Sequence, residues 1–403
     1  MDIAIKPAES NDELRMVHDL LAQVHSGGDY SSALRWLETT GTHYPAFLRE
    51  HTRIATIKNE VVGGLRLITD TIRLGEARLK MGGIGWVTTA ERHRGKGICR
   101  LLMDDILAYM REHKYHVSLL FGIPDFYHKF GYVTTLADYS IVMNATEALT
   151  FERPFRSRPA RHGDIPAIRK IHDANDRGVA CSILRSAAHF ACRADTATPF
   201  QALIDEQGKV IAYYSFSVQD DHVRVDEVGV AEPGLCAAVV GTTAAIAEDK
   251  SLGHIRFHVP PPHPFARYLL QFKSRHEMRI DRDADGMMAF IDLGECLELM
   301  IPEWENLLAR STTAAYRTEF TLLVDTAGPY RIRVNRGAVD VARVSGSNKI
   351  SVTPHELMHL VTGYRYPDDI LDSRHRFISC DTRLLFTTLF PKRCPYVWRF
   401  DRF

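Results

Sequence analysis

GGIGWVTTAERHRGKGICRLLMDDILAYMREHKYHVSLLFGIPDFYHKFGY, residues 82–132, is the stretch that decides the fold. An apolar strand pattern over 84–88 leads into a basic turn over 92–97. A helix with apolar residues at helical spacing follows from Ile98. A second short strand pattern, over 116–121, and an aromatic segment, FYHKFGY, complete the stretch. The order strand, turn, helix, strand predicts an α/β fold.

The turn Arg92-x-x-Gly95-x-Gly97 predicts an anion site. Glycine suits positions where the backbone comes close to a ligand or where φ is positive. Because a helix begins at this turn, free N–H groups and the positive end of the helix dipole point out of it, as a pyrophosphate requires. Arg94 and Lys96 add positive charge. The pattern lacks the Gly-Lys-Ser/Thr of a P-loop and the glycine spacing of a dinucleotide fingerprint. The alternative is a basic helix start without a ligand.

The strand, the turn, the helix, the second strand and the FY-x-x-FGY segment together resemble the acyl-CoA-binding core of the GNAT acetyltransferases, over residues 3–145. In that family the turn holds the coenzyme A pyrophosphate and the preceding strand pairs with the pantetheine arm. The resemblance implies acetyl-CoA as the acyl donor. The coenzyme-binding residues that it implies are Gly85, Trp86, Val87, Arg92, His93, Arg94, Gly95, Lys96, Gly97, Ile98, Gly122 and Ile123.

Composition is ordinary for a globular protein of two or three domains: 403 residues, 45% hydrophobic and 25% charged. The formal net charge is zero, so no global field favours nucleic acid or a membrane surface. Seven scattered cysteines without a CxxC pair predict free thiols in a reducing compartment. No signal-peptide core and no bilayer-length apolar run is present. We therefore expect a cytoplasmic protein without nucleic-acid or membrane partners.

The rest of the chain predicts two further regions. A strand over 2–6, a helix opened by the capping box Ser10-x-x-Glu13, a second helix and a meander of strands precede the quoted stretch. After a linker rich in proline and arginine, a similar order returns between 160 and 259, and 287–293 is expected to close that second region. Its equivalent turn, Ala-Glu-Pro-Gly at 231–234, predicts a copy that does not bind coenzyme A.

From Cys296 a helix, a three-stranded meander and a helix ending before Gly363 resemble the sterol-carrier-protein-like domain of the Eis family of GNAT enzymes. The full resemblance implies an α/β (α+β) fold of two tandem GNAT-type domains and this third domain. The boundaries are 1–150 for the GNAT acetyl-CoA-binding catalytic domain, 151–295 for the divergent GNAT-like domain and 296–403 for the sterol-carrier-like domain. It also implies a homo-oligomer, which is a hexamer in that family.

Acetyl transfer to an amine needs a base, stabilisation of the oxyanion and a proton for the departing thiolate. By resemblance, Tyr127 is the general acid and the terminal carboxylate of Phe403 is the base, while N–H groups near Val87 polarise the carbonyl. An α-carboxyl group has an ordinary pKa of about 3.5, so it is ionised at neutral pH. The alternatives are a core tyrosine, as expected for Tyr132 and Tyr139, and a frayed terminus.

The acceptor pocket of the family suggests Asp29, Trp36 and Asp401 as substrate-binding residues. Acidic and aromatic groups suit a cationic amine, such as an aminoglycoside, a polyamine or a lysine side chain. Plain surface residues are the alternative. Cys99 stands at a helix N-terminus, which would lower its thiol pKa and would allow a ping-pong acyl-enzyme. Direct transfer is more usual in GNAT enzymes, so we favour core packing for Cys99.

His355-Glu356-Leu357-Met358-His359 matches the zinc-peptidase pattern HExxH. Thr353-Pro354-His355-Glu356 also reads as a capping box with proline at the first helical position, which gives Glu356 a structural task. We favour the structural interpretation and expect no metal. The other rivals to an N-acetyltransferase are a non-catalytic acyl-CoA sensor and a lipid-binding scaffold.

Overall fold

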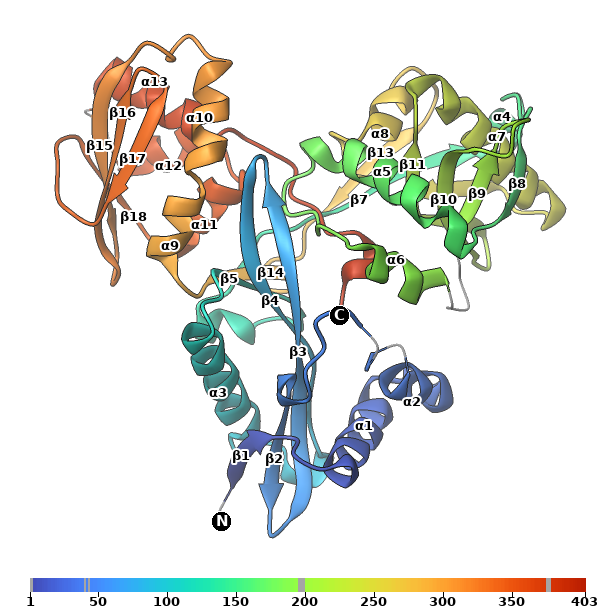
Figure 1. The fold of residues 1–403 in the computed structure, drawn as a ribbon, viewed down its shortest axis with the longest axis horizontal. Helices are drawn as coiled ribbons and strands as arrows, with labels where there is room; N and C mark the ends of the chain where they lie inside the picture. The colour runs from blue at the N-terminus through green and yellow to red at the C-terminus, as the bar shows by residue number, and fades with distance from the viewer. Residues whose placement is uncertain (1–2, 40, 43, 195–199, 375–377) are drawn as a thin grey trace. The chain divides into compact units, whose positions relative to one another are not determined.

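The computed structural model describes residues 3–39, 41–42, 44–194, 200–374 and 378–403. The chain divides into two compact units (Figure 1). Residues 1–135, 282–392 and 403 form the first, and residues 136–281 and 393–402 form the second. The α/β fold class expected from the sequence is confirmed, because every sheet is flanked by helices of its own unit.

A seven-stranded sheet of order β1-β2-β3-β4-β5-β14-β6 frames the first unit. Its first four strands form an antiparallel meander, β5 runs parallel to β4, and β14 pairs antiparallel with β5 and β6. The strands are β1 (Ala4–Pro7), β2 (Thr52–Ile57), β3 (Glu60–Leu74), β4 (Ala77–Thr89), β5 (Val117–Gly122), β6 (Val133–Thr134) and β14 (Asp285–Phe290). Asp2, at the start of the expected first strand, lies outside the described residues.

Helices cover both faces of this sheet, with α3 (Ile98–Glu112) on one and α1 (Asn11–His25) and α2 (Tyr30–Glu38) on the other (Figure 1). The apolar stripe of α3 packs on β3 and β4 in one core cluster, whereas α1 and α2 pack in another with Ile54 and Val61. The capping box at Ser10 is confirmed, since its hydroxyl accepts from the N–H of Glu13 and the Glu13 carboxylate accepts from the N–H of Ser10.

The first unit also holds a four-stranded sheet of order β17-β16-β15-β18. Its strands and helices are β15 (Arg317–Val324), β16 (Gly328–Asn335), β17 (Ala338–Ala342), β18 (Lys349–Val352), α9 (Leu293–Leu299), α10 (Ile301–Ala309), α11 (Pro354–Thr362), α12 (Pro367–Arg374) and α13 (Cys380–Leu389). Buried Glu303 of α10 accepts from the N–H of Glu76 at 2.7 Å, which fastens the tip of the β3–β4 hairpin. The sterol-carrier-like identity of this part stays a prediction.

The second unit repeats the topology with a sheet of order β13-β7-β12-β11-β10-β9-β8. Its elements are β7 (Asp138–Asn144), β8 (Arg156–Pro159), β9 (Gln201–Ile204), β10 (Val210–Val218), β11 (His222–Val230), β12 (His254–Phe257), β13 (Arg275–Arg279), α4 (Ala145–Ala148), α5 (Ile165–Asn175), α6 (Ala187–Ala194), α7 (Cys236–Asp249) and α8 (Pro264–Leu269). Short 3₁₀ helices complete the chain at η1 (Arg49–His51), η2 (Glu91–His93), η3 (Tyr127–Phe130), η4 (His162–Asp164), η5 (Asp176–Gly178), η6 (Pro233–Leu235) and η7 (Arg399–Asp401).

One strand expectation is wrong. The strand expected over 287–293 does not close the second region, because β14 pairs with β5 of the first sheet. The converse holds for β7, which precedes position 150 and pairs with β12 and β13 of the second sheet. Period-two hydrophobicity identifies a strand without naming its sheet. The three-domain division at 150 and 295 remains a prediction.

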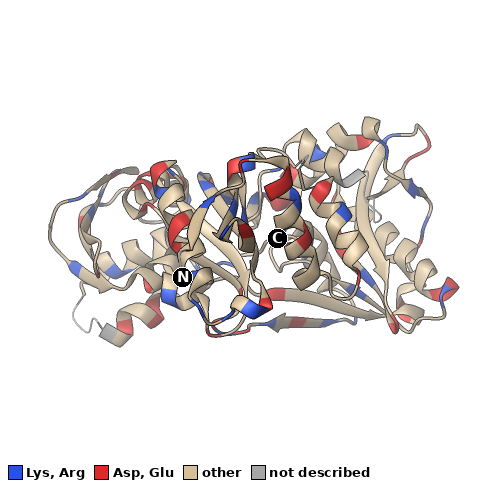
Figure 2. Ribbon diagram, turned by 90° about the horizontal axis from the view of Figure 1, so that it is seen from below, with Lys and Arg blue, Asp and Glu red and all other residues tan. Residues whose placement is uncertain are grey.

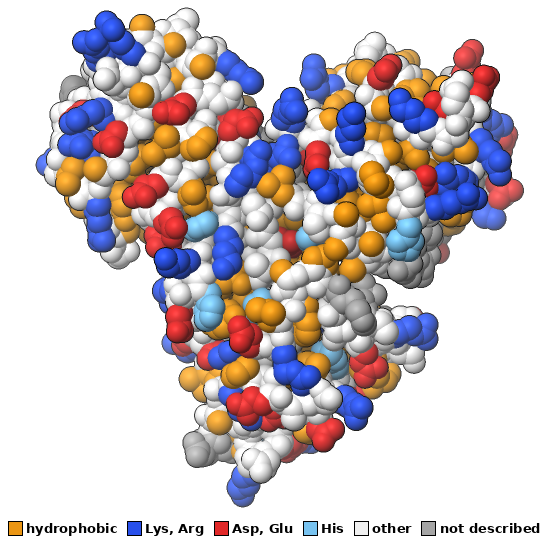
Figure 3. Space-filling view, in the orientation of Figure 1, with side chains coloured by type: hydrophobic (Ala, Val, Ile, Leu, Met, Phe, Trp, Pro, Cys, Tyr) orange, Lys and Arg blue, Asp and Glu red, His pale blue; other side chains and the backbone are white. Residues whose placement is uncertain are grey.

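Charged residues of both signs are interspersed along the ribbon and over the visible face of each unit (Figures 2 and 3). This distribution agrees with the equal numbers of acidic and basic residues, 50 of each. In the described part of the chain, no helix combines the length and the apolar character needed to cross a bilayer.

Candidate active site

The centre of the candidate site is the point where β4 and β5 stop pairing. Their parallel ladder covers four pairs, from Met81 with Val117 to Ile84 with Leu120. Beyond Ile84, β4 continues to Thr89 alongside β3. The main chain from Gly85 onward is thus paired with β3 and has left the β5 ladder, as an extended pantetheine arm would require.

A β-bulge lies within this segment. Gly64 pairs with Thr88 and Arg66 pairs with Gly85, so β4 places Trp86 and Val87 opposite the single residue between them on β3. Trp86 has φ of +60°, which is uncommon for a bulky side chain. Its indole stacks on Trp36 of α2, with ring centroids 5.4 Å apart and an interplanar angle of 20°. The bulge lies where the resemblance to GNAT enzymes predicted the thioester to bind, near Val87.

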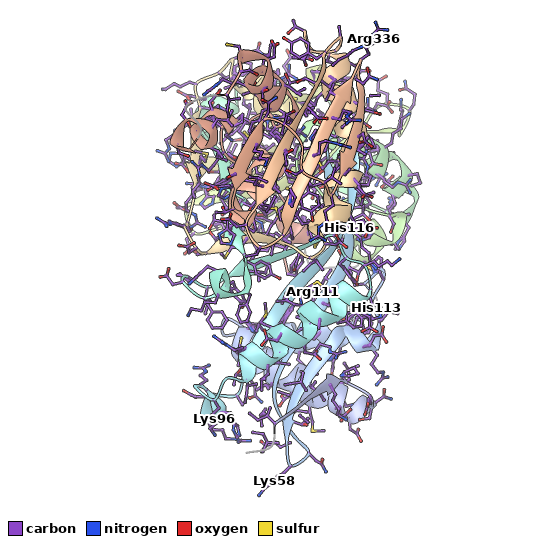
Figure 4. All side chains as sticks on the ribbon, turned by 90° about the vertical axis from the view of Figure 1, so that its left-hand side faces the viewer. Lys58, Lys96, Arg111, His113, His116 and Arg336 are labelled. Carbon is purple, nitrogen blue, oxygen red and sulfur yellow. The ribbon has the colours of Figure 1, made fainter. Side chains whose placement is uncertain are left out.

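The basic turn has the geometry of an open anion site. Gly95 and Gly97 have φ of +76° and +79°, and nothing lies within 4 Å of where a Cβ would stand on either. Gly97 is the N-cap of α3, and no side chain caps that helix. Lys96 lies in this turn, at the opposite end of α3 from Arg111 and His113 (Figure 4). The first N–H groups of α3 are therefore available to an anion.

The charges of the turn are partly compensated. Arg92 forms an ion pair with Glu60, and the ammonium of Lys96 lies 3.1 Å from Nδ1 of His93. Partial desolvation, with Lys96 and Arg92 beside it, lowers the pKa of His93 below its ordinary value of 6.5. A pocket of about 660 Å³ adjoins the turn, lined by Leu20, Gln23, Val24, Ala90, Glu91, Arg92 and Arg94.

Tyr127 begins η3 directly after the loop that follows β5. The end of β5 makes room for its ring, because a Cβ on Gly122 would lie 2.4 Å from Tyr127 Cδ2. The side chain is 8% exposed, and burial raises the pKa of its phenol above the ordinary value of 10. The phenol is therefore protonated at neutral pH. Ile123, by contrast, is 64% exposed.

Tyr132 has the structural role that the sequence suggested for it. It is fully buried, and its hydroxyl donates to Ser118 Oγ at 2.6 Å, which in turn donates to the carbonyl of Gly82. No hydrogen-bond partner stands at the Tyr127 hydroxyl among the described residues. The two tyrosines belong to one core cluster but differ in their hydroxyl groups: that of Tyr132 is hydrogen-bonded within the core, and that of Tyr127 is not, in the part of the chain that the structure describes.

Cys99 packs against the core of the first unit, as favoured from the sequence, but its expected lowered pKa is wrong. Its position at the N-terminus of α3 predicted a lowered thiol pKa, but burial raises the pKa to about 11. The desolvation of the thiolate outweighs the helix dipole, so the thiol is protonated at neutral pH. This disfavours a ping-pong acyl-enzyme at Cys99.

Phe403, the last residue, packs at the point where β4 leaves β5. A Cβ on Gly85 would lie 3.0 Å from the carboxyl carbon of Phe403, and a Cβ on Gly83 would lie 2.2 Å from its ring. The ring also meets Phe121 of β5 edge to face, with centroids 6.0 Å apart. A side chain at Gly83 would therefore displace the Phe403 ring, and one at Gly85 would be tightly packed against the carboxyl carbon. The terminal carboxyl group therefore lies beside the bulge, within the same unit.

The three suggested acceptor residues have different surroundings. Asp29 is the N-cap of α2 and accepts from the N–H of Ser32 at 3.0 Å, and these bonds lower its pKa. Trp36 packs on the bulge, as described above. Asp401 is buried in the second unit, where Arg185 donates to both of its carboxylate oxygens. Asp29 and Asp401 therefore already have structural hydrogen bonds.

Sequence reasoning missed His25, the last residue of α1. Its Nε2 lies 2.8 Å from Thr88 Oγ1 and 3.3 Å from the carbonyl oxygen of Val87, and its ring meets Trp86 edge to face. It is separated from Val87 by 62 positions in the sequence. A histidine in the last turn of a helix carries no sequence signal for this contact.

The HExxH segment has the structural role that was favoured. Thr353 caps α11, its hydroxyl accepts from the N–H of Glu356, and the Glu356 carboxylate accepts from the N–H of Thr353. His359 Nε2 lies 2.9 Å from the carbonyl oxygen of Thr134. Among the described residues, no three His, Cys, Asp or Glu side chains are grouped to hold a metal ion.

Comparison with known proteins gives the same family as the motifs. Residues 5–135 match the family model of the acetyltransferase (GNAT) domain, which confirms that resemblance. No curated protein matches the chain.

Solved structures with the same fold span the whole chain. A GCN5-related N-acetyltransferase from Anabaena variabilis is 17% identical with a TM-score of 0.75, and a probable N-acyltransferase from Enterococcus faecalis is 16% identical with a TM-score of 0.76. Eis1 from Mycobacterium abscessus is 14% identical with a TM-score of 0.64. Each comparison covers 100% of both chains. At these identities, the likeness establishes the shared fold.

Proposed function

We propose that this chain, an N-acetyltransferase by virtue of the GNAT domain in residues 5–135, transfers the acetyl group of acetyl-CoA directly to a primary amine of a cationic acceptor. The observation that carries the proposal is the position of the Phe403 carboxyl group beside Gly85, where β4 leaves β5. A carboxylate there is next to the strand that would hold the thioester. The turn from Arg92 to Ile98 would bind the pyrophosphate.

Each residue then has one task in the reaction. The Phe403 carboxylate accepts the proton of the attacking ammonium group, and the free amine adds to the thioester carbonyl carbon. The N–H of Val87 stabilises the oxyanion that forms. Tyr127 donates its phenolic proton to the sulfur as the C–S bond breaks, and the second proton that the amine nitrogen loses as the amide forms restores the phenol through solvent. The products are the acetamide and coenzyme A, with the first proton of the ammonium group left on the Phe403 carboxylate. Burial raises the pKa of the Tyr127 phenol, so the group is in its proton-bearing form at neutral pH.

Trp36 and Asp29 would face the acceptor amine, the former by cation–π contact. By resemblance to the Eis family, aminoglycosides, polyamines and lysine side chains are the acceptors to test. The same resemblance suggests a homo-oligomer, and the scattered cysteines suggest a cytoplasmic location.

The test is turnover by the purified full chain with acetyl-CoA and a panel of these three amine classes, together with Tyr127→Phe. We expect Tyr127→Phe to lower kcat by about 100-fold while the Kd of acetyl-CoA stays within a factor of about three. Tyr132→Phe is the matched control, because it removes a hydroxyl from the same core cluster and should affect stability alone. Acetyl-CoA binding without turnover on any amine would favour the sensor, and copurified lipid would favour the scaffold.

A further inference from the structure

We propose that His25 is a positioning residue for acyl transfer, because its imidazole holds residues 86–88 of β4 in the bulged conformation. The inference rests on the function proposed above, since its consequence for turnover follows from the task of the Val87 N–H. The contacts that carry it lie within the first unit.

The acceptors fix the tautomer of His25. The carbonyl oxygen of Val87, 3.3 Å from Nε2, can only accept, so we assign the ring hydrogen of His25 to Nε2. Thr88 Oγ1 donates its own hydrogen to the carbonyl of Trp86 at 3.1 Å, so it too accepts from Nε2, at 2.8 Å. One imidazole N–H thus reaches Val87 of the bulge and Thr88 after it, and the Thr88 hydroxyl reaches back to the carbonyl of Trp86, the other residue of the bulge.

The bulge needs such support. Trp86 is in a left-handed backbone conformation that bulky residues adopt only when the surroundings determine it. Its indole is held on one side by the stack on Trp36, and His25 meets it edge to face with centroids 5.6 Å apart. These contacts come from α1 and α2, so the two helices that cover one face of the sheet also set the conformation of the strand.

A positioning role differs from a role in proton transfer. The N–H of His25 is engaged by the strand whether or not the ring takes up a second proton, so the donor function persists in both charge states. Burial lowers the pKa of His25 below 6.5, an effect that the Val87 carbonyl partly opposes, and the ring is therefore neutral at pH 7. Because the donor is what matters, another side chain with an N–H at the same reach should replace it.

The test compares His25→Leu, which removes the donor, with His25→Gln, whose amide can donate to the same two acceptors. We expect His25→Leu to lower kcat by about 30-fold, because the oxyanion donor is misplaced, and to change the Kd of acetyl-CoA less than about threefold. His25→Gln should restore kcat to within about threefold of the unmodified chain. Arg15→Leu, at an exposed position of the same helix, is the control and should leave kcat unchanged.

Amide hydrogen exchange of the peptide that contains residues 86–88 gives a readout independent of turnover. Exchange should rise in His25→Leu and return in His25→Gln. An unchanged exchange rate with His25→Leu would overturn the inference, as would a His25→Gln variant no more active than His25→Leu, which would assign proton transfer to the imidazole. If exchange follows the expectation while the unmodified chain acetylates no amine, the bulge assignment stands and the proposed reaction fails.

Discussion

The two seven-stranded sheets present the same strand junction in two forms, one beside the candidate active site and one beside a buried charge network. In the first unit β4 carries its bulge at Trp86 and Val87, whereas in the second unit β11 carries an extra residue at Asp226, between Val225 and Glu227. Glu227 directly follows that extra residue and is fully buried. The second unit therefore places a buried carboxylate next to its bulge.

The second unit uses this place for a buried charge network. Arg185 donates to both carboxylate oxygens of Glu227, at 2.7 and 2.8 Å, and also binds Asp401. Burial opposes these charges, but Asp401 and Glu227 raise the pKa of Arg185, and Arg185 holds the pKa of Glu227 below its ordinary value. The chain segment 393–402 belongs to this unit and packs there through Trp398, whose indole donates to Asp176.

The turns that follow the bulges differ in the same sense. Ten positions separate Thr88 from Ile98 at the start of α3, and eight separate Val228 from Cys236 at the start of α7. The longer turn contains two glycines with positive φ, and the shorter one contains a proline at the first position of η6. Proline has no N–H to give an anion. Both units thus have a bulge in the equivalent strand, but they differ in the residues beside the bulge and in the turn that follows it.

The largest expected effect is the loss of stability when the buried charge network around Arg185 is broken. Arg185→Met should lower the free energy of unfolding by about 3–5 kcal/mol, because Glu227 and Asp401 would remain buried without their cation. Urea unfolding at pH 7 measures it. Arg177→Met, at an exposed position of the same unit, is the control. A loss below about 1 kcal/mol would mean that the network is not what holds this region together.

The next effect concerns the turn of the first unit. Replacing Arg94-Gly95-Lys96 by the Ala-Glu-Pro of the second unit's turn should weaken acetyl-CoA binding by about 100-fold, roughly 2.7 kcal/mol, because N–H donors and positive charge are lost together. Titration calorimetry measures the affinity. Glu232→Ala in the other turn should leave it unchanged. Equal affinities for the triple variant and the unmodified chain would remove the pyrophosphate from this turn.

Local patterns in the sequence predicted most of the elements, because capping boxes, glycine stops and period-two strands act over a few residues. The helix start at Ser10, the helix end at Gly363 and the capping role of Glu356 are confirmed for that reason. The exchange of β7 and β14 between the sheets was not predictable, since pairing partners are chosen by the tertiary fold.

The part of the candidate site that uses main-chain N–H groups was predictable from the sequence, because glycine spacing indicates the backbone conformation. The Gly95 and Gly97 turn has the positive φ angles that its sequence implied. The left-handed conformation of Trp86 was not predictable, because tryptophan rarely adopts a positive φ. The contacts of His25 with Val87 and of Arg185 with Asp401 span 62 and 216 residues, beyond the reach of any local pattern.

A smaller effect is expected at the terminus of the chain. Adding Gly-Ser after Phe403 moves the free carboxylate away from Gly85 and should lower kcat by about 50-fold, roughly 2.3 kcal/mol, while acetyl-CoA still binds. Initial rates against amine concentration measure it. Phe403→Leu keeps a terminal carboxylate and should retain most of the turnover. If the extended chain is fully active, the base lies elsewhere and the terminus only packs.

The smallest expected effect is a dependence of stability on pH that arises from His263 in the second unit. His263 of the second unit caps α8, its Nδ1 accepts from the N–H of Phe265, and its ring meets Trp398 edge to face. Burial lowers its pKa to about 3. Between pH 6.5 and 3 the unfolded chain binds this proton and the folded chain does not, so stability is complete above pH 6.5 and falls as the pH drops through that window.

The loss attributable to His263 between pH 7 and pH 5 is about 2 kcal/mol. His263→Asn keeps a cap and removes the titrating group, so its urea midpoint should fall less over this interval than that of the unmodified chain. Because His263 lies in the unit that lacks the glycine turn, acetyl-CoA affinity measured at pH 7 should be equal in the two proteins. Parallel stability curves would show that His263 takes up its proton without unfolding, and the core around Trp398 would then be more open to water than its burial implies.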